Sequence, residues 1–378
     1  MTSTDETKTA PEGRLFEPFA VGELRLRNRI VMAPMTRRRC PEGVPGDDVA
    51  RYYARRAEGG VGLIITEGIY PDHPTAEALP NVPRVSTSDA LAGWRGVVEG
   101  VHRAGAAIAC QLWHMGPARR VGLPPDPALP GWGPMDVRED GELLVKGMTE
   151  ADIETIIASY ARSALAAKAA GFDAVEIHGA HGYLIDAFFW ASANRRADRY
   201  GEGIAGRGRF AREVVAAVRR EVGPHFPILF RFSQWKSTDY AARIADTPDE
   251  LLQLLGPLVD AGVDIFHAST RRIADPAFEG SARSLAGWTR NLTGRPVIGV
   301  GSVGLNKAHE SLKYRTRESL DAGVASLAPA LDILARGEAD LIAVGRALIA
   351  DPEWPAKVRE GRQAEIRPLT PADLEHLT

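Results

Sequence analysis

The chain has 378 residues, of which 44% are hydrophobic and 25% charged, and its formal net charge is -3 at pH 7. This composition is that of a soluble globular protein with enough sequence to bury a large core. So small a charge gives no long-range attraction to nucleic acid or an anionic membrane, and no apolar stretch approaches the roughly 20 residues that span a bilayer. We therefore expect small-molecule partners.

The two ends of the chain and the cysteines suggest one cytoplasmic domain. Residues 1–14 are polar and lack the apolar segment of a signal peptide, so we expect a disordered tail there. Residues 15–365 are expected to form a single domain, followed by a C-terminal tail at 366–378. Cys40 and Cys110 are the only cysteines, too few for an iron–sulfur cluster, a cysteine metal site or a disulfide framework. Such usage is typical of a reducing cytoplasm.

Short apolar or β-branched runs alternate along the chain with polar loops and helical patterns. Eight such runs predict strands at 29–33, 62–66, 106–113, 173–178, 227–232, 263–268, 296–300 and 340–344. Eight consecutive βα units predict a (β/α)8 TIM barrel. A doubly wound open sheet is the alternative, but the phosphate fingerprint G-x-G-x-x-G is absent after the first strand.

Helix start and stop signals support this count. Thr149 and Asp152 form a predicted capping box, and Gly171 is placed to end the helix that follows it. Thr247 repeats the start signal ahead of a proline, and Gly262 the stop signal. Each of these helices therefore ends just before a predicted strand.

The connection at 114–149, after the third strand, is unusually long for a βα loop. It has two Gly/Pro-rich patches and a predicted hairpin with its turn at Glu139 to Gly141. A loop of that length at a barrel mouth suggests a lid.

Catalytic groups of a barrel lie just beyond the carboxyl ends of its strands. Side chains alternate along a strand, so His178 is expected to point toward the mouth from strand four, and Gln111 and Trp113 from strand three. Arg231 lies between two phenylalanines of strand five, and a charge in such a setting needs a fixed anionic partner.

The stretch HGAHGYL at 178–184 has three interpretations from the residues alone. A pair of histidines can chelate a metal, as in a metal-dependent barrel hydrolase, but a third protein ligand is not evident at the other strand ends. The rings can instead be hydrogen-bonded parts of a polar core. They can also act together with Tyr183 in acid–base chemistry.

Serial motifs identify a resemblance that covers the chain from about Leu15 to Arg362. They are NRIVMAPMTR (28–37), LIITEG (63–68), QLWHMG (111–116), VEIHGAHGYLIDAFF (175–189), NRRADRYG (194–201), FRFS (230–233), VGSVG (300–304) and LIAVGRALIADPEW (341–354). In order, spacing and placement at strand ends they resemble the old yellow enzyme family of FMN-dependent ene-reductases.

The resemblance implies a bound FMN. Its expected contacts are Pro34, Met35, Thr36, Gly68, Gln111, Arg231, Gly301, Ser302, Gly345 and Arg346. The Thr36 hydroxyl would bond flavin O4, Gly68 would leave room for the ring, and Gln111 would pair with N3–H and O2. Arg231 would lie at N1 and O2, where reduced flavin carries negative charge. The last four positions would bind the phosphate through backbone N–H groups and the Arg346 guanidinium.

The resemblance also implies NAD(P)H-dependent, ping-pong reduction of activated alkenes, by a monomer or homo-oligomer. His178 and His181 would bind the carbonyl or nitro oxygen of the substrate, Tyr183 would donate a proton to the α-carbon, and Trp113 would shape the pocket. No metal is expected. The alternative within flavin chemistry is an oxidative, amine-type dehydrogenase.

Some residues depart from the family pattern or lie outside the expected site. Phe189–Ala191 and Tyr200–Glu202 replace the family's usual residues and put the pocket shape in doubt. We expect Arg37 to lie in a solvated loop and His267 in the core, and the segment 306–336 has no assigned role.

Overall fold

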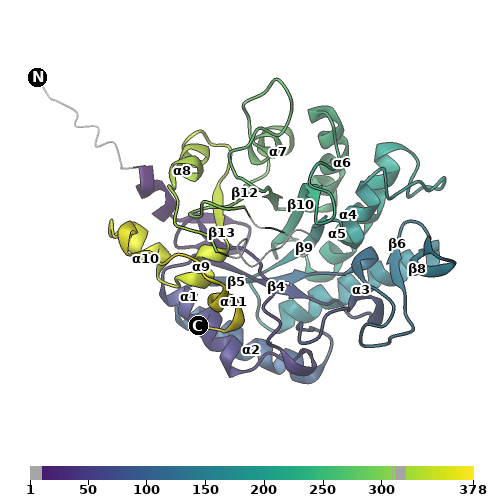
Figure 1. Ribbon diagram of the computed structural model, residues 1–378, viewed down its shortest axis with the longest axis horizontal. Coiled ribbons are helices and arrows are strands. Elements are labelled where there is room, and N and C mark those ends of the chain that lie inside the picture. The colour runs from purple at the N-terminus through teal and green to yellow at the C-terminus, as the bar shows by residue number, and fades with distance from the viewer. Residues whose placement is uncertain (1–10, 309, 311–320) are drawn as a thin grey trace, which may run out of the picture.

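A computed structural model describes residues 11–308, 310 and 321–378 (Figure 1). Eight parallel strands close into a barrel in the order β10-β11-β12-β13-β3-β4-β5-β9. They are β3 (Ile30–Met32), β4 (Leu63–Ile69), β5 (Ala107–Leu112), β9 (Ala174–His181), β10 (Ile228–Lys236), β11 (Ile265–Ser269), β12 (Val297–Val300) and β13 (Leu341–Val344). The predicted single-domain (β/α)8 barrel is confirmed, and each of the eight runs overlaps a barrel strand, although β4, β9, β10 and β11 continue beyond the predicted ends.

Helices surround the barrel, as Figure 1 shows. The longer ones are α1 (Asp47–Glu58), α2 (Ser88–Arg103), α3 (Glu150–Ala169), α5 (Gly203–Val222), α6 (Pro248–Ala261), α7 (Leu285–Thr293) and α8 (Ala328–Ala335). The predicted start signals are confirmed, because Thr149 and Asp152 form a reciprocal capping box and the Thr247 side chain caps α6. Gly262, with φ of 115°, ends α6 in the left-handed conformation that glycine adopts without steric cost.

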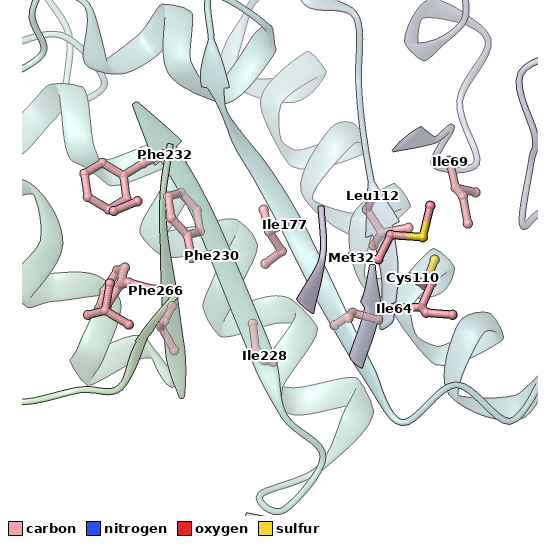
Figure 2. Packing of buried hydrophobic residues seen from close by; sticks show 14 of the residues in the cluster. Met32, Ile64, Ile69, Cys110, Leu112, Ile177, Ile228, Phe230, Phe232 and Phe266 are labelled. Atoms are coloured by element: carbon pink, nitrogen blue, oxygen red, sulfur yellow. The ribbon is translucent and has the colours of Figure 1, made fainter. Parts of the chain in front are cut away.

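The hydrophobic core has two layers, one inside the barrel and one between strands and helices. Inward residues such as Val31, Ala109 and Leu229 form the inner layer. The alternate positions face the helices, among them Cys110 and Phe230, which Figure 2 shows in the outer layer. Because side chains alternate along each strand, inward positions near the strand ends can carry polar side chains while the outward positions stay apolar.

A hairpin that the sequence analysis did not predict lies next to the barrel. Strands β1 (Phe19–Val21) and β2 (Leu24–Leu26) pair antiparallel, and Leu24 and Leu26 are buried among the inner-layer residues. Three-residue strands give too little alternation to be recognised. Since the hairpin precedes the amino end of β3, it covers the end of the barrel opposite the expected site.

The long connection after β5 contains a three-stranded sheet. Strands β6 (Gly131–Gly133), β7 (Val137–Glu139) and β8 (Glu142–Gly147) form it, and β7 and β8 make the predicted hairpin. Before it lies a loop, residues 119–129, which we call the Arg119 loop. The fully buried Arg119 guanidinium donates to the carbonyls of Glu77, Leu123, Pro124, Asp126 and Leu129.

The C-terminal residues are packed against the barrel. Short helix α11 (Pro371–Glu375) follows α9 (Arg346–Ala350) and α10 (Trp354–Arg359). Arg37 donates to the carbonyls of Asp373 and His376, and Arg56 to that of Thr378. Arg37 is 7% exposed, so the expectation of a solvated loop is wrong for this residue; its guanidinium is buried because it supplies donors to backbone carbonyls. In the described part of the chain, no helix is both long and apolar enough to cross a membrane.

Candidate active site

The carboxyl ends of β5, β9, β10 and β11 bring a polar group together inside the barrel. Register places Arg231 beside His178 on one side and His267 on the other. Gln111 and Glu176 form the neighbouring pair. All five side chains are at most 8% exposed. The expected convergence of His178, Gln111 and Arg231 is therefore present, with two further members that the site prediction did not include.

Glu176 is the centre of this group. Its carboxylate accepts hydrogen bonds from Gln111 Nε2 and His267 Nδ1, both at 2.7 Å, and the Glu176 and His267 side chains are fully buried. Burial lowers the pKa of His267, against the opposing field of Glu176. Alternation had already placed Glu176 on the same face as His178, so a buried acid on the inner face was the available signal.

Arg231 keeps donors available toward the mouth. Burial lowers its pKa, while the fields of Glu176 and Tyr183 oppose that shift, and Glu176 lies on the neighbouring strand β9. Arg231 Nη2 donates to Ser269 Oγ at 3.3 Å. Within the described residues, Arg231 Nε has no hydrogen-bond partner, nor has His178 Nδ1. Because buried polar atoms are normally satisfied, these orphaned groups fit a polar ligand at the strand ends.

The histidines, Tyr183 and Trp113 form one aromatic cluster. The Tyr183 ring lies 5.0 Å from Trp113 and 5.3 Å from His178, and the two histidine rings are 5.1 Å apart, all between centroids. Burial raises the pKa of Tyr183 to about 12, with Arg231 opposing. Burial, Arg231 and His267 hold the pKa of His178 well below its usual value. At neutral pH the site therefore combines a protonated phenol with a neutral imidazole.

His181 is held in an unfavourable backbone conformation by its surroundings. Its φ is 66°, a left-handed value that costs energy for a residue other than glycine. Its N–H donates to Ser233 Oγ at 3.0 Å, and its carbonyl accepts from the Ser237 N–H at 3.1 Å. Its Nε2 lies 2.8 Å from Ser269 Oγ, and the Trp235 ring lies 4.4 Å from the imidazole between centroids, tilted by 35°. Ser269 thus links His181 to Arg231.

A fully buried ion pair secures the segment that carries Tyr183. Lys236 Nζ lies 2.8 and 2.9 Å from the two carboxylate oxygens of Asp186, and both side chains have no exposed surface. Asp186 also accepts from the Gly182 N–H at 2.6 Å. Burial raises the pKa of Asp186 to about 6, against the field of Lys236. The pair joins the start of α4 (Leu184–Phe189) to the end of β10.

The segment after β3, expected to lie against the flavin, depends on Glu67 of β4. Pro34 and Met35 are partly exposed and Thr36 is exposed. The Glu67 carboxylate accepts from the backbone N–H groups of Arg37 and Arg38, at 2.9 and 3.1 Å. Burial raises the pKa of Glu67 from 4.5 to about 7. Glu67 was not among the predicted site residues, although it lies within the quoted LIITEG motif.

Changing Glu67 to glutamine should alter how stability depends on pH. The folded protein binds the Glu67 proton more tightly than the unfolded chain, so this group stabilises fully below about pH 4.5, and that stability is lost as pH rises through 7. Relative to wild type, Glu67→Gln should gain about 3 kcal/mol in unfolding free energy between pH 4.5 and 8. Urea unfolding at several pH values measures this gain. The exposed Glu99→Gln variant is the control, and a wild-type pH dependence in Glu67→Gln would contradict the prediction.

Gly68 provides space for Trp113. A Cβ at Gly68 would lie 2.3 Å from Cε3 of the Trp113 indole, which is impossible without displacing that ring. The absence of a side chain at Gly68 is therefore explained by the packing of Trp113. A flavin contact at Gly68 stays a prediction.

The expected phosphate-binding residues lie at the ends of the paired strands β12 and β13. Gly301 faces the segment after β11, since a Cβ there would approach Thr270 Oγ1 to 2.6 Å. Ser302 has φ of 51°, and its hydroxyl donates to the Arg271 carbonyl. Gly345 precedes α9, and Arg346 Nη2 donates to the Lys307 carbonyl at 2.6 Å. The four positions are thus neighbours, and their phosphate contacts stay a prediction.

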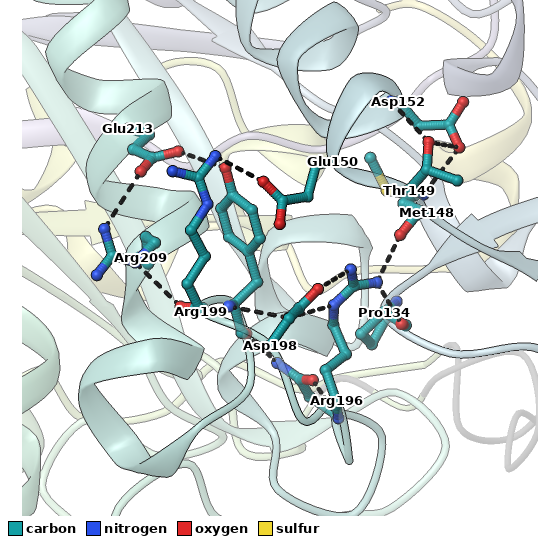
Figure 3. Close-up of polar contacts among 12 residues, drawn as sticks. Pro134, Met148, Thr149, Glu150, Asp152, Arg196, Asp198, Arg199, Arg209 and Glu213 are labelled. Carbon is teal, nitrogen blue, oxygen red and sulfur yellow. Dashed lines mark hydrogen bonds and ion pairs between the residues drawn. The ribbon is translucent and has the colours of Figure 1, made fainter.

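The second departure, Tyr200–Glu202, lies next to the polar region around Arg196 and Asp198, which Figure 3 shows, whereas Phe189 of the first departure is fully buried in the outer layer of the core. Arg196 pairs with Asp198 and donates to the carbonyls of Pro134 and Met148. Tyr200 is fully buried and its hydroxyl donates to Glu213 at 2.8 Å. The Arg196 contacts connect the loop after α4 to the ends of the three-stranded sheet β6–β8. Most of the segment 306–336 that had no assigned role is described, but 309 and 311–320 lie outside the described residues.

Metal binding finds no support at the histidine pair. Among the residues that the structure describes, no three His, Cys, Asp or Glu side chains are grouped so as to hold a metal ion. The His178 and His181 rings meet edge to face, with 71° between their planes. The two rings therefore do not form part of a complete protein ligand set.

Known proteins are similar to this chain in sequence and in fold. The model of the NADH:flavin oxidoreductase / NADH oxidase family matches residues 14–365. An NADH oxidase of Thermoanaerobacter brockii is 36% identical over 366 residues, covering 93% of this chain and 52% of that protein. The flavin oxidoreductase hxnT of Emericella nidulans is 32% identical over 368 residues, covering 93% of this chain and 92% of that one.

A solved structure of morphinone reductase in complex with tetrahydroNAD superposes with a TM-score of 0.78 and 30% identity, covering 95% of this chain and 93% of that one. The alignments with the first three curated relatives span only 52% to 59% of those proteins.

Proposed function

Because the chain belongs to the NADH:flavin oxidoreductase / NADH oxidase family, the old yellow enzyme family, we propose that it is an FMN-dependent oxidoreductase. It takes hydride from NAD(P)H and reduces the activated C=C bond of α,β-unsaturated carbonyl or nitro compounds. A 12-oxophytodienoate reductase of Oryza sativa, 39% identical over 228 residues, and the nicotinamide analogue in the morphinone reductase complex support this assignment.

The observation that carries the proposal is the pairing of two sets of groups at one end of the barrel. Gln111 and Arg231 offer donors at the strand ends, and Arg231 Nε is buried without a partner in the described chain. His178, His181 and Tyr183 lie together beside them. The first set fits the pyrimidine edge of a flavin, and the second fits an electrophile that needs an oxygen-binding donor and a proton.

When bound, FMN would supply the chemistry of accepting and delivering a hydride. Arg231 and Gln111 would orient its pyrimidine edge, and Thr36 would bond its O4. The imidazoles of His178 and His181 would hold the substrate oxygen, which polarises the alkene. The Tyr183 hydroxyl would donate a proton to the α-carbon, and Trp113 would exclude water from one side.

An anaerobic titration tests the proposal. The visible flavin spectrum of the purified protein is recorded while NADPH or NADH is added, and then cyclohexenone. Bleaching by the nicotinamide followed by recovery with the enone is the expected result. A colourless protein that cannot be reconstituted with FMN would contradict the cofactor assignment and the roles that depend on it.

A further inference from the structure

The interior of the barrel contains a negative charge that the proposed chemistry does not use. Glu176 is fully buried, and its carboxylate has two hydrogen-bond donors, Gln111 Nε2 and His267 Nδ1. Neither donor carries a full charge, because the amide is neutral and burial, together with Arg231, lowers the pKa of His267. The positive charge near this carboxylate is that of Arg231.

Such an arrangement is costly as a purely structural device. An apolar side chain would fill the same strand position, as Leu229 and Ala109 do beside it in the inner layer. Burying a carboxylate and a guanidinium without a direct hydrogen bond between them costs more than an apolar replacement. Glu176 instead contacts Gln111, which is expected to bind flavin, and His267, which lies beside Arg231 in the strand register.

We propose that Glu176 is a positioning residue that sets the electrostatic field at the pyrimidine edge of bound FMN. Its carboxylate offsets the charge of Arg231, and its bond to Gln111 Nε2 fixes the orientation of that amide. The proposal rests on the proposed function, since it takes Arg231 and Gln111 to be flavin contacts.

The direction of the effect follows from charge balance. Reduction of FMN by two electrons and one proton adds one negative charge, which develops at N1 and O2 beside Arg231. Arg231 favours the reduced form, and Glu176 opposes it. Removing the Glu176 charge should therefore favour reduction by about tenfold at a given potential, which is about 30 mV for a two-electron couple.

The test measures the midpoint potential of the FMN-loaded protein by anaerobic spectroscopic titration. Glu176→Gln keeps the size of the side chain and supplies a hydrogen-bonding amide. The midpoint potential of this variant should be more positive by about 30 mV, which corresponds to the tenfold change. Glu338→Gln is the matched control, because Glu338 is a buried carboxylate outside the barrel strands, bonded to Ser284. Its potential should equal that of wild type.

A second variant separates charge from packing. His267→Gln leaves the carboxylate and a donor to it in place. At a given potential, its ratio of reduced to oxidised FMN should therefore stay within about threefold of wild type. An equal shift in His267→Gln and Glu176→Gln, an unchanged potential in Glu176→Gln, or failure of Glu176→Gln to fold would each overturn the assignment. If the wild-type protein retains no FMN, the proposed function itself fails, whereas FMN binding with an unresponsive potential removes only this inference.

Discussion

Replacing Tyr183 with phenylalanine is expected to slow reoxidation of the reduced flavin by cyclohexenone by about 10²- to 10⁴-fold, the usual contribution of a positioned general acid. Reduction by NAD(P)H should change little, because that half-reaction needs no proton from the phenol. The phenyl ring keeps the contacts that Tyr183 makes with Trp113 and His178. Stopped-flow measurement of the two half-reactions separates the effects.

The control for this variant is Tyr200→Phe. Tyr200 is a buried tyrosine whose hydroxyl donates to Glu213 outside the site, so its loss should leave both half-reactions near the wild-type rate. Reoxidation of Tyr183→Phe at the wild-type rate would show that the proton comes from another donor, and the role of Tyr183 would have to be abandoned.

Replacing Lys236 with methionine should lower the free energy of unfolding by about 3 to 5 kcal/mol. The substitution leaves Asp186 buried with a charge that no cation offsets, although the Gly182 N–H still donates to it. Denaturant unfolding monitored by circular dichroism gives the value. Since the pair secures the segment that carries Tyr183, we also expect slower reoxidation of the flavin in this variant.

Two comparisons make this prediction specific to the buried pair. Lys146 lies 2.9 Å from Asp152 but its side chain is 38% exposed, so Lys146→Met should cost at most about 1 kcal/mol. The double variant Asp186→Asn/Lys236→Met removes both charges and should recover part of the loss. A cost for Lys236→Met no larger than that for Lys146→Met would contradict the argument.

Local signals in the sequence were sufficient for the barrel and for part of the site. Strands β9 and β10 were recognisable as short apolar runs interrupted by single polar residues, and alternation then showed which side chains point inward. His178, Gln111 and Arg231 could be placed together because all parallel strands of a barrel end at the same mouth. The same signals could not place hairpin β1–β2, whose strands are too short to alternate.

Groups that act through distant partners were harder to predict. Asp186 and Lys236 are 50 residues apart, and in the sequence each resembles an ordinary charged residue at the end of an element. Arg37 was misjudged for the same reason, because its carbonyl acceptors belong to residues more than 330 positions away. Such pairing depends on the folded structure, so no local sequence pattern predicts it.

The Arg119 loop offers a way to change which substrates the proposed enzyme accepts. One guanidinium holds the loop by donating to backbone carbonyls, four of which belong to residues 123–129. Every residue type has a carbonyl, so the side chains at those positions are not what hold the loop. Leu123 packs against the buried cluster that contains Trp113, which connects the loop to the predicted pocket. Residues 120–129 can therefore be substituted in libraries of variants to change the wall of the predicted pocket, while the barrel and Arg119 are kept constant.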